Sequence, residues 1–592
     1  MGLRRAVDHL MHQGEFMHVR SSGWRRRHRL GAAVAAASLV FIAAACGGDD
    51  SGSSDTTAAS ATTAAATETT AASTDTTASG GTATTAAGTA TTAAPATTAG
   101  GAEGTPTKGG EATVLLFSEI GSLDPVRFTG SGGAEAQRAF ANYGALMVYD
   151  LDSAKVNPVL ADSITANADF TVWTLKLKDG VTFSDGSAYD AEAVKANWAR
   201  AQDPANRSPS FTAMMAVSDL TVVDPTTLQI TLSAPNSHFP STISRAGLNY
   251  IASAQAIAAG TDLTSQSIGA GPYTLESWTR DDRMIMNANP DWKGSDGPYL
   301  DKLTFRVVGD EEQRINTFST GDADAFYTAT PESVKRAEDA VDGAGYTSVK
   351  VTTGQAFVFN NSAAPFSDLR VRTIFAEGVD WQAMADAVFG EGATYGQNFT
   401  VDGTDLYTPD AALPAYNPED AQKLIDEYNA ENGGGPLVIN MLAFQQSLDQ
   451  ARAEYIQTAL SQLKDIQVNI TVNDSPTNIG LVLAGNYSVS SWGFPVVAPD
   501  PAIYNSAFST ALTNYSKYSN PDVDQWILDA RTTDDATKAL DDYHQVFAQL
   551  AKDIPYFPYV NTTNGFVTSP DLHGATVYED GILRTDLIWK QS

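Results

Sequence analysis

The chain has 592 residues, of which 43% are hydrophobic and 18% charged, with 69 acidic side chains, 37 basic side chains and one cysteine. A single cysteine excludes a disulfide framework and a thiolate zinc site, because both need several cysteines. The net charge of −32 argues against a nucleic-acid-binding protein, because neutralising phosphates requires a basic surface.

The first 45 residues have the order of a secretory signal peptide. A basic stretch, residues 25–29, precedes the apolar run Gly31–Ala45, which ends in small residues. The apolar run is shorter than the ~20 residues of a membrane-spanning helix, and no other stretch is a candidate, so a polytopic membrane protein is excluded. Met17 would give a signal of more ordinary length.

Cys46 follows the small residues directly and resembles the cysteine of the bacterial lipobox, which becomes the acylated N-terminus after cleavage. Ala43 stands where leucine is usual in that motif. Between Ser51 and Gly100, 46 of the 50 residues are Ala, Thr, Ser or Gly, which predicts a disordered tether over residues 46–105. A flexible chain of about 60 residues reaches roughly 40–45 Å. We therefore expect an exported protein, lipid-anchored through Cys46 to the outer face of the cell membrane.

Two hairpins are predicted early in the globular part. The segment Thr171–Leu177 alternates, with Trp173, Leu175 and Leu177 on one face, and a turn leads it into residues 181–183. Residues 220–223 and 228–232 form a second hairpin through an Asp-Pro turn.

Three helices are predicted later in the chain. Asn417 and Pro418 have the residue types of an N-cap and a first helical residue, and apolar side chains follow at helical spacing. Residues 447–464 and 534–552 show the same periodicity. Strands and helices together predict a mixed α/β architecture, long enough for about three domains.

Sequence signatures of enzymes are largely missing. His238, His544 and His573 are the histidines outside the signal region, and no H-E-x-x-H, G-K-[ST] or G-x-S-x-G motif occurs. Ser461 and Lys464 have the S-x-x-K spacing of penicillin-binding enzymes, but the companion motifs S-D-N and K-T-G do not occur. We therefore expect no catalytic residue, no metal site and no cofactor.

An ordered set of short motifs covers most of the globular part. It comprises Lys108-Gly109-Gly110, Ser122–Pro125, Leu146–Asp150, Asn157–Ser163, Trp173–Gly186, Gly269–Tyr273, Asn289–Gly294, Phe359-Asn360 and Pro365–Arg372. In this order and spacing the chain resembles the family 5 extracellular solute-binding proteins of ABC importers, the dipeptide- and oligopeptide-binding group.

The resemblance implies a bilobal periplasmic-binding-protein-like fold, type II, of the large peptide-binding cluster. An extra inserted domain makes three domains in all. The expected boundaries are 106–147, 269–358 and 561–592 for domain I, 148–268 for domain II, and 359–560 for domain III.

The resemblance also predicts one side of a ligand site. In peptide binders of the family, a segment soon after the first strand hydrogen-bonds the peptide backbone, and the matching segment here is Phe128–Gly132. Thr129, Gly130 and Ser131 are therefore the expected contacts. Small residues let a backbone approach, and hydroxyls supply donors and acceptors.

The other side of the site is expected at the strand end Ser491–Pro495, where Trp492 and Phe494 would contact the ligand. Peptide binders of the family place an aspartate three positions after this tryptophan as counter-ion for the peptide α-amino group, and here that position is Pro495. The nearest acid after it is Asp500. No arginine is assigned to a ligand carboxylate, since Arg370 and Arg372 belong to a motif with a structural interpretation.

The predicted function is capture of a solute, with peptides favoured, by hinge closure and its delivery to a membrane permease. The partners would be ABC permease subunits and their cytoplasmic ATPases, with the binding protein itself a monomer and no nucleic acid bound. A binder of an oligosaccharide, an opine-like compound or a metal chelate is the first alternative, and Pro495 favours it. A surface hydrolase using Ser461 and Lys464, and a surface adhesin or sensor, also remain open.

Overall fold

The computed structural model describes residues 104–130, 132–150, 155–390, 393–493, 496 and 499–591. Only the backbone is described for residues 351–354, 476 and 561–562. The predicted signal peptide, Cys46 and almost all of the tether lie outside the described residues, as do Ser131, Phe494 and Pro495.

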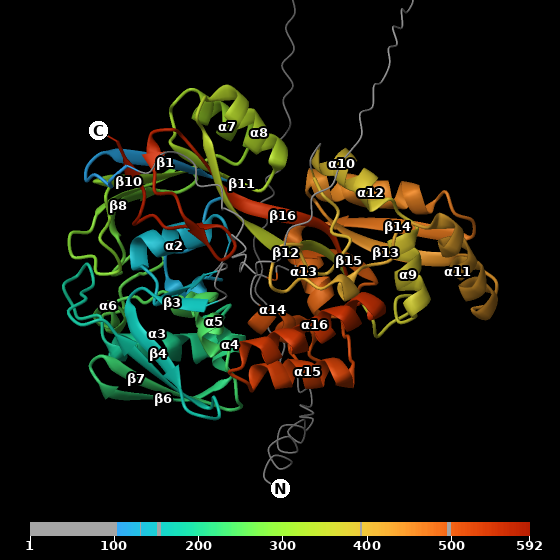
Figure 1. Cartoon of the computed structure of the whole chain (residues 1–592), viewed down its shortest axis with the longest axis horizontal. Coiled ribbons are helices and arrows are strands. Elements are labelled where there is room, and N and C mark those ends of the chain that lie inside the picture. Colours follow the sequence, from blue (N-terminus) through green and yellow to red (C-terminus); the bar gives the residue numbers. More distant parts are fainter. Residues whose placement is uncertain are drawn as a thin grey trace, which may run out of the picture. The chain divides into compact units, whose positions relative to one another are not determined.

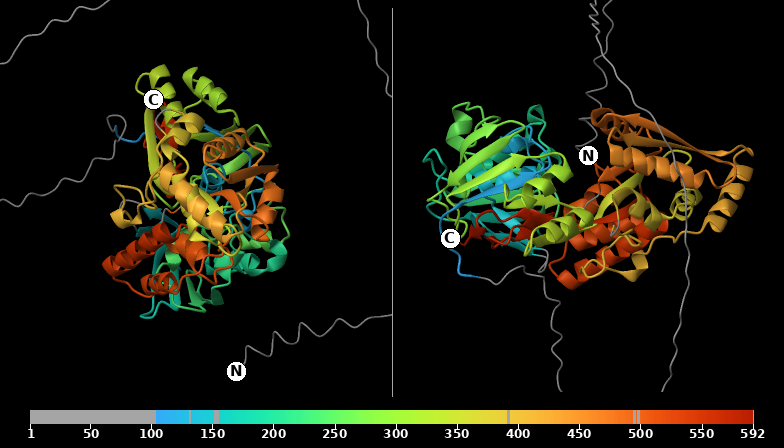
Figure 2. Two further views of the ribbon diagram at one scale, coloured as in Figure 1. Left: turned by 90° about the vertical axis from the view of Figure 1, so that its right-hand side faces the viewer. Right: turned by 90° about the horizontal axis from the view of Figure 1, so that it is seen from above.

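A ten-stranded sheet forms the framework (Figure 1). Its order is β14 (Ile466–Asn473), β13 (Leu437–Phe444), β15 (Val489–Gly493), β12 (Gly345–Phe359), β16 (Tyr556–Thr568), β11 (Ala325–Thr328), β1 (Glu111–Leu116), β10 (Lys302–Val307), β9 (Arg283–Ala288) and β8 (Tyr273–Thr279). We call β12 and β16 the crossing strands, residues 360–555 the second lobe, and the described residues before β12 and after β16 the first lobe. Segments before β12, blue to green, and those after it, yellow to orange, lie on either side of the crossing strands (Figure 2).

The crossing strands pair antiparallel along most of their length, but their register is interrupted. Val351 pairs with Thr562, Gln355 with Val560, and Ala356 with Pro558, with a shift at each step. Proline has no N–H to donate to the ladder, and bulges are where a strand bends. The sheet is therefore continuous between the lobes but locally weakened where they meet.

The first lobe holds one end of the ten-stranded sheet and a separate antiparallel sheet. In β1, Val114 and Leu116 join one hydrophobic cluster while Leu115 joins another, so this strand is buried on both faces. The second sheet has the order β4 (Ala161–Ala166), β5 (Val172–Leu177), β7 (Thr227–Leu232) and β6 (Val217–Asp224). The core behind it extends to helix α2 (Glu135–Tyr143) and to Trp292 and Tyr578.

Short elements complete the first lobe. Its other helices are α3 (Ala191–Gln202), α4 (Phe211–Met214), α5 (Phe239–Ser244), α6 (Ala254–Ala258), α7 (Glu311–Ser319) and α8 (Pro331–Ala340), with 3-10 turns at Pro125–Arg127, Pro204–Asn206 and Gly247–Asn249. Its other strands are β2 (Met147–Asp150), β3 (Lys155–Pro158), β17 (Leu572–His573), β18 (Val577–Tyr578), β19 (Ile582–Leu583) and β20 (Trp589–Lys590).

The second predicted hairpin is confirmed and the first is half wrong. Strands β6 and β7 pair antiparallel as expected. Strand β5 buries Trp173, Leu175 and Leu177 as its alternation predicts, but its neighbours are β4 and β7 and not residues 181–183. Thr182 instead makes an isolated bridge to Ala188, because the longer strands β4 and β7 already satisfy both edges of β5.

The second lobe is largely helical around its end of the sheet. Its helices are α9 (Leu369–Glu377), α10 (Trp381–Phe389), α11 (Pro418–Glu431), α12 (Ser447–Leu460), α13 (Ser475–Leu483), α14 (Pro499–Ala507), α15 (Pro521–Arg531) and α16 (Ala536–Asp553), with a 3-10 turn at Pro409–Ala411. Aromatic rings fix the crossing strands to this core: Phe357 contacts Phe375 at 5.3 Å and Tyr559 at 4.7 Å between ring centroids.

All three predicted helices are confirmed. The Asn417 side chain accepts a hydrogen bond from the Asp420 amide at the start of α11, as an N-cap does. Helix α16 buries Tyr543, Phe547 and Leu550. Helix α12 ends at Leu460, earlier than expected. Among the described residues, no helix combines the length and apolar character needed to cross a membrane.

Candidate ligand-binding site

The loop of residues 128–133 connects a 3-10 turn to α2 and is anchored at both ends. Phe128 is buried and packs edge-on against Tyr143 and Tyr250, each 5.9 Å away between ring centroids. A Cβ on Gly130, whose φ is +86°, would lie 2.1 Å from the backbone of Ala246. The sequence suggested that Gly130 is small so that a ligand backbone can approach. The packing of the loop against Ala246 already requires glycine at this position.

The backbone donors of this loop are bound by two carboxylates. Glu135 Oε1 accepts from Thr129 N at 2.7 Å, from Thr129 Oγ1 at 2.8 Å and from Gly130 N at 3.1 Å. Asp580 Oδ2 accepts from Gly132 N at 3.0 Å. Burial raises the pKa of Glu135, although the hydrogen bonds from Thr129 and Gly130 act in the opposite direction.

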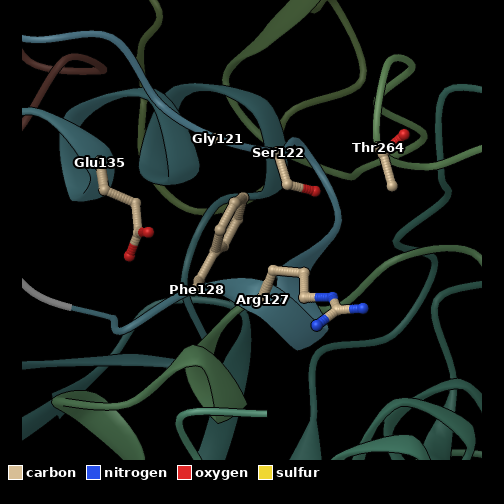
Figure 3. Close-up of a pocket in the computed structure, with 6 residues that line it drawn as sticks. All are labelled: Gly121, Ser122, Arg127, Phe128, Glu135 and Thr264. Atoms are coloured by element: carbon tan, nitrogen blue, oxygen red, sulfur yellow. The ribbon is translucent and has the colours of Figure 1, made fainter. Parts of the chain in front are cut away.

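A pocket of about 340 Å³ opens beside this loop (Figure 3). Its lining is Gly121, Ser122, Arg127, Phe128, Glu135 and Thr264. The Arg127 side chain is exposed, whereas Phe128 is buried. Glu135 thus contributes to the wall of this pocket while it holds the donors of Thr129 and Gly130.

Trp492 lies at the end of β15, directly opposite Ala356 of β12, where the crossing strands shift register. Its ring is half-buried and meets Tyr515 edge-on at 5.4 Å between centroids. The crossing strands therefore lie between Trp492 and β11, whose Tyr327 packs against Gly133 of the loop. Trp492 and the loop belong to opposite sides of the crossing strands, as an interlobe site requires.

Arg452 is a buried cation beneath this strand end that sequence reasoning missed. It is 4% exposed, its Nη2 donates to Ser491 Oγ at 2.7 Å, and its guanidinium lies over the Tyr559 ring at 4.7 Å. Asp449 pairs with it from the previous turn of α12. Burial lowers the pKa of Arg452. Its i,i+3 spacing from Asp449 was the available signal, but that spacing is common on helix surfaces.

The other charged residues singled out from the sequence have structural partners. Asp500 is 1% exposed and lies 2.8 Å from Arg531 Nε, so its charge is neutralised within the second lobe. Arg370 pairs with Asp368 and Glu431, and Arg372 donates to the carbonyl of Asp553.

The polar residues considered for catalysis also make hydrogen bonds or ring contacts with other residues of the protein. The Ser461 hydroxyl donates to the Gln457 carbonyl at the exposed end of α12. His544 contacts the Asp405 carbonyl, and the His573 ring packs at a tilt against Trp589. Among the described residues, no group of three metal-ligating side chains comes together.

A second polar connection joins the lobes away from the crossing strands. Ser237 N donates to the Arg531 carbonyl at 2.7 Å, and Ser237 Oγ and His238 Nε2 lie 3.3 Å and 3.1 Å from the Ala530 carbonyl. These carbonyls belong to the last turn of α15, where a helix leaves them without internal partners. We call these four residues the interlobe contact.

Comparison with known proteins identifies the family. The model of the bacterial extracellular solute-binding proteins, family 5 (middle part), matches residues 155–516. The glutathione-binding protein GsiB of Pectobacterium atrosepticum is 27% identical over 442 residues, which are 72% of this chain and 84% of GsiB.

Solved structures show the same fold. The dipeptide-binding protein of Pseudoalteromonas sp. SM9913 in complex with Met-Leu is 19% identical, with a TM-score of 0.69 over 81% of this chain and 100% of that chain. AgaA of A. tumefaciens R10 in complex with agropinic acid is 21% identical, with a TM-score of 0.68 over 82% and 99%. The bilobal type II fold is thereby confirmed. The chain belongs to family 5 of the bacterial extracellular solute-binding proteins, which are solute-binding components of ABC importers and not enzymes.

Proposed function

We propose that the protein captures a peptide-like solute between its lobes by hinge closure and delivers it to a membrane permease. The observation that carries this proposal is the interrupted register of the crossing strands beside Pro558. Trp492 pairs with Ala356 at that interruption, so bending there would move this ring relative to the first lobe. Family membership supplies the partners, an ABC permease and its ATPases.

Peptides are the favoured ligand class because the similar proteins GsiB and the Pseudoalteromonas protein are named for glutathione and dipeptide binding. A non-peptide solute is the second candidate. Asp500, the acid nearest to Pro495, is paired with Arg531, so it does not offer a free charge to a peptide amino terminus. The similarity to AgaA with agropinic acid agrees with that candidate.

Native mass spectrometry of the full chain, purified without an unfolding step, tests both candidates. A series of short-peptide masses is expected, because closed binding proteins retain their cargo. One discrete non-peptide mass would be consistent with the importer role but would identify the ligand as a non-peptide solute. Unchanged small-angle scattering with every retained or added solute would contradict hinge closure.

The remaining features of the sequence belong to the same proposal. The proposal includes a signal peptide over residues 1–45, acylation of Cys46 and a tether over residues 46–105, which would hold the binding protein near its transporter. It also includes the three-domain division and a monomeric state. Tethering raises the effective concentration at the permease.

Cys46→Ala tests the anchor. We expect this variant to appear in the culture medium, because a single acylated cysteine would be its attachment to the membrane. A serine-to-alanine change in the tether, Ser60→Ala, is the matched control and should stay with the cells. Retention of the Cys46→Ala variant in the membrane fraction would contradict the anchor.

A further inference from the structure

The strands of the second lobe end toward the first lobe. Strand β12 runs from the first lobe into the second, and β15 pairs antiparallel with it, so the carboxyl end of β15 points back toward the first lobe. Strand β13 is parallel to β15, and β14 is parallel to β13, so all three end at the same edge. In open α/β sheets, ligands bind at the carboxyl ends of parallel strands. Trp492 therefore lies on the edge of the second lobe where a solute would be held.

Tyr559 is the extra residue of a β-bulge between the crossing strands. Gln355 pairs with Val560, and the next residue of β12, Ala356, pairs with Pro558. Tyr559 falls between these two pairs and stands opposite no residue of β12, as the extra residue of a bulge does. Ala356 also pairs with the end of β15, so the bulge and this strand end are joined through one residue of β12.

The Arg452 guanidinium links the bulge to the end of β15. It lies over the Tyr559 ring, 4.7 Å from the centroid, and its Nη2 donates to Ser491 Oγ at 2.7 Å. It also lies 5.7 Å from the centroid of the Phe357 ring in β12. All four side chains are buried. One side chain of α12 therefore contacts β12, β15 and β16 at the level of the bulge.

Asp449 balances the charge of Arg452 and extends the link to β13. One oxygen of this carboxylate pairs with the guanidinium, and the other accepts from the Phe444 amide at the end of β13. Removing one partner of a buried ion pair is strongly destabilising, because it leaves the other charge uncompensated. A test of the link must therefore keep the positive charge and change only the shape of the group that carries it.

We propose that Arg452 is a positioning residue for solute capture, which fixes the strand end that carries Trp492 to the bulge so that both move as one unit. This rests on the proposed function, in which the lobes close around a solute. Arg452 holds Tyr559 to the second lobe, so bending is left to the other register shift, between Val351 and Gln355. Without the link, the Trp492 ring would have to be ordered when the solute binds, and this ordering would oppose binding.

Arg452→Lys tests the proposal, because a single ammonium keeps the charge but cannot both lie over Tyr559 and donate to Ser491. Calorimetry on the full chain uses glutathione and Met-Leu, the solutes named for the similar proteins, as probes. We expect Arg452→Lys to weaken binding about tenfold, with an unfolding midpoint close to that of the wild type. Arg370→Lys is the matched control and should bind as the wild type does, because Arg370 also pairs with carboxylates and lies over a tyrosine ring in the second lobe.

A double-mutant cycle with Trp492→Ala shows whether the two residues act together. If Arg452 acts through Trp492, adding Arg452→Lys to Trp492→Ala weakens binding no further, and this result supports the proposal. A purely structural arginine would weaken binding equally with and without the Trp492 ring. Additive losses, or undiminished binding by Trp492→Ala alone, therefore overturn the positioning role.

The remaining outcomes separate this role from solute capture. Equal binding by the wild type and Arg452→Lys overturns the role and leaves capture intact. If Arg452→Lys folds poorly, Ser491→Ala removes only the acceptor on β15, and equal binding by that variant overturns the role as well. If neither probe binds to the wild type, the solute that it retains on purification replaces them. A wild type that neither retains nor binds a solute overturns the proposed function together with the role of Arg452.

Discussion

The crossing strands and the interlobe contact both join the lobes, but they are built from opposite chemistry. The crossing strands combine a backbone ladder with a buried aromatic core around Phe357, which has three ring neighbours within 6 Å. The interlobe contact consists of hydrogen bonds from Ser237 and His238 to two carbonyls at the end of α15. The first connection is continuous backbone with a buried aromatic core, whereas the second consists of hydrogen bonds whose partners water can replace.

This difference indicates how the two connections contribute to stability. Burying aromatic area contributes several kcal/mol for each residue, whereas a hydrogen bond contributes about 1 kcal/mol net. Because water can replace the partners of Ser237 and His238, the interlobe contact can break without unfolding either lobe.

The largest effect is expected at the crossing strands. Phe357 is 1% exposed, and Phe357→Ala leaves a cavity among Phe375, Trp381 and Tyr559. We expect a loss of about 3–5 kcal/mol in the free energy of unfolding, measured by urea denaturation. Leu512→Ala, at a side chain that is 65% exposed, should change it by less than about 0.5 kcal/mol. A loss for Phe357→Ala no larger than that for Leu512→Ala would contradict a stabilising role of the aromatic core of the crossing strands.

A smaller effect, dependent on pH, is expected at Glu579. Burial raises its pKa to about 8 in the folded protein from the ordinary value of 4.5, so the folded state holds the proton more tightly. The resulting stability is fully present below the unfolded pKa and is lost as pH rises towards the folded pKa. Relative to Glu579→Gln, which does not titrate, the wild-type protein should lose roughly 1.4 kcal/mol per pH unit between about pH 5 and 7.

Urea denaturation at a series of pH values measures this slope. Glu338→Gln is the control, since its side chain is exposed and should leave the slope as in the wild type. Parallel stability curves for the wild type and Glu579→Gln would mean that Glu579 stays ionised in the folded protein.

The smallest effect on stability is expected at the interlobe contact. His238→Ala removes the interaction with the Ala530 carbonyl and the ring contact with Tyr543, 6.0 Å between centroids. We expect the closing equilibrium to fall about fivefold, the equivalent of one hydrogen bond, with little change in unfolding. Small-angle scattering with saturating solute measures this equilibrium. The control is His573→Ala, because the His573 ring packs against Trp589 within the first lobe. A large loss of stability in His238→Ala would show that this contact is part of the fold.

The predictions from local pattern succeeded where neighbours in the sequence decide the structure. The N-cap Asn417 and the alternation of Trp173, Leu175 and Leu177 depend on residues a few positions away. Pairing of β5 with residues 181–183 failed because strand neighbours are chosen by competition among distant segments.

The candidate site, too, could be predicted only in part from the sequence. The motif order located the loop and Trp492, but the sequence offered no reason to connect the loop with Glu135 or Asp580. The smallness of Gly130 was attributed to an approaching ligand, whereas the structure gives the nearer cause in the backbone of Ala246. Arg452 was missed because a buried arginine and an exposed one look alike in a helical pattern.

The sequence was enough to identify the family, the α/β class and the positions of helix starts and turns, because caps, alternation and motif order can be recognised from residues close together in the chain. The tertiary structure alone decided which polar groups are already satisfied. Gly132 and Asp580 are 448 positions apart, and their hydrogen bond arises only after the chain has returned from the second lobe. The charge preference of a ligand site depends on such leftover donors and acceptors, and these are known only when every partner is in place.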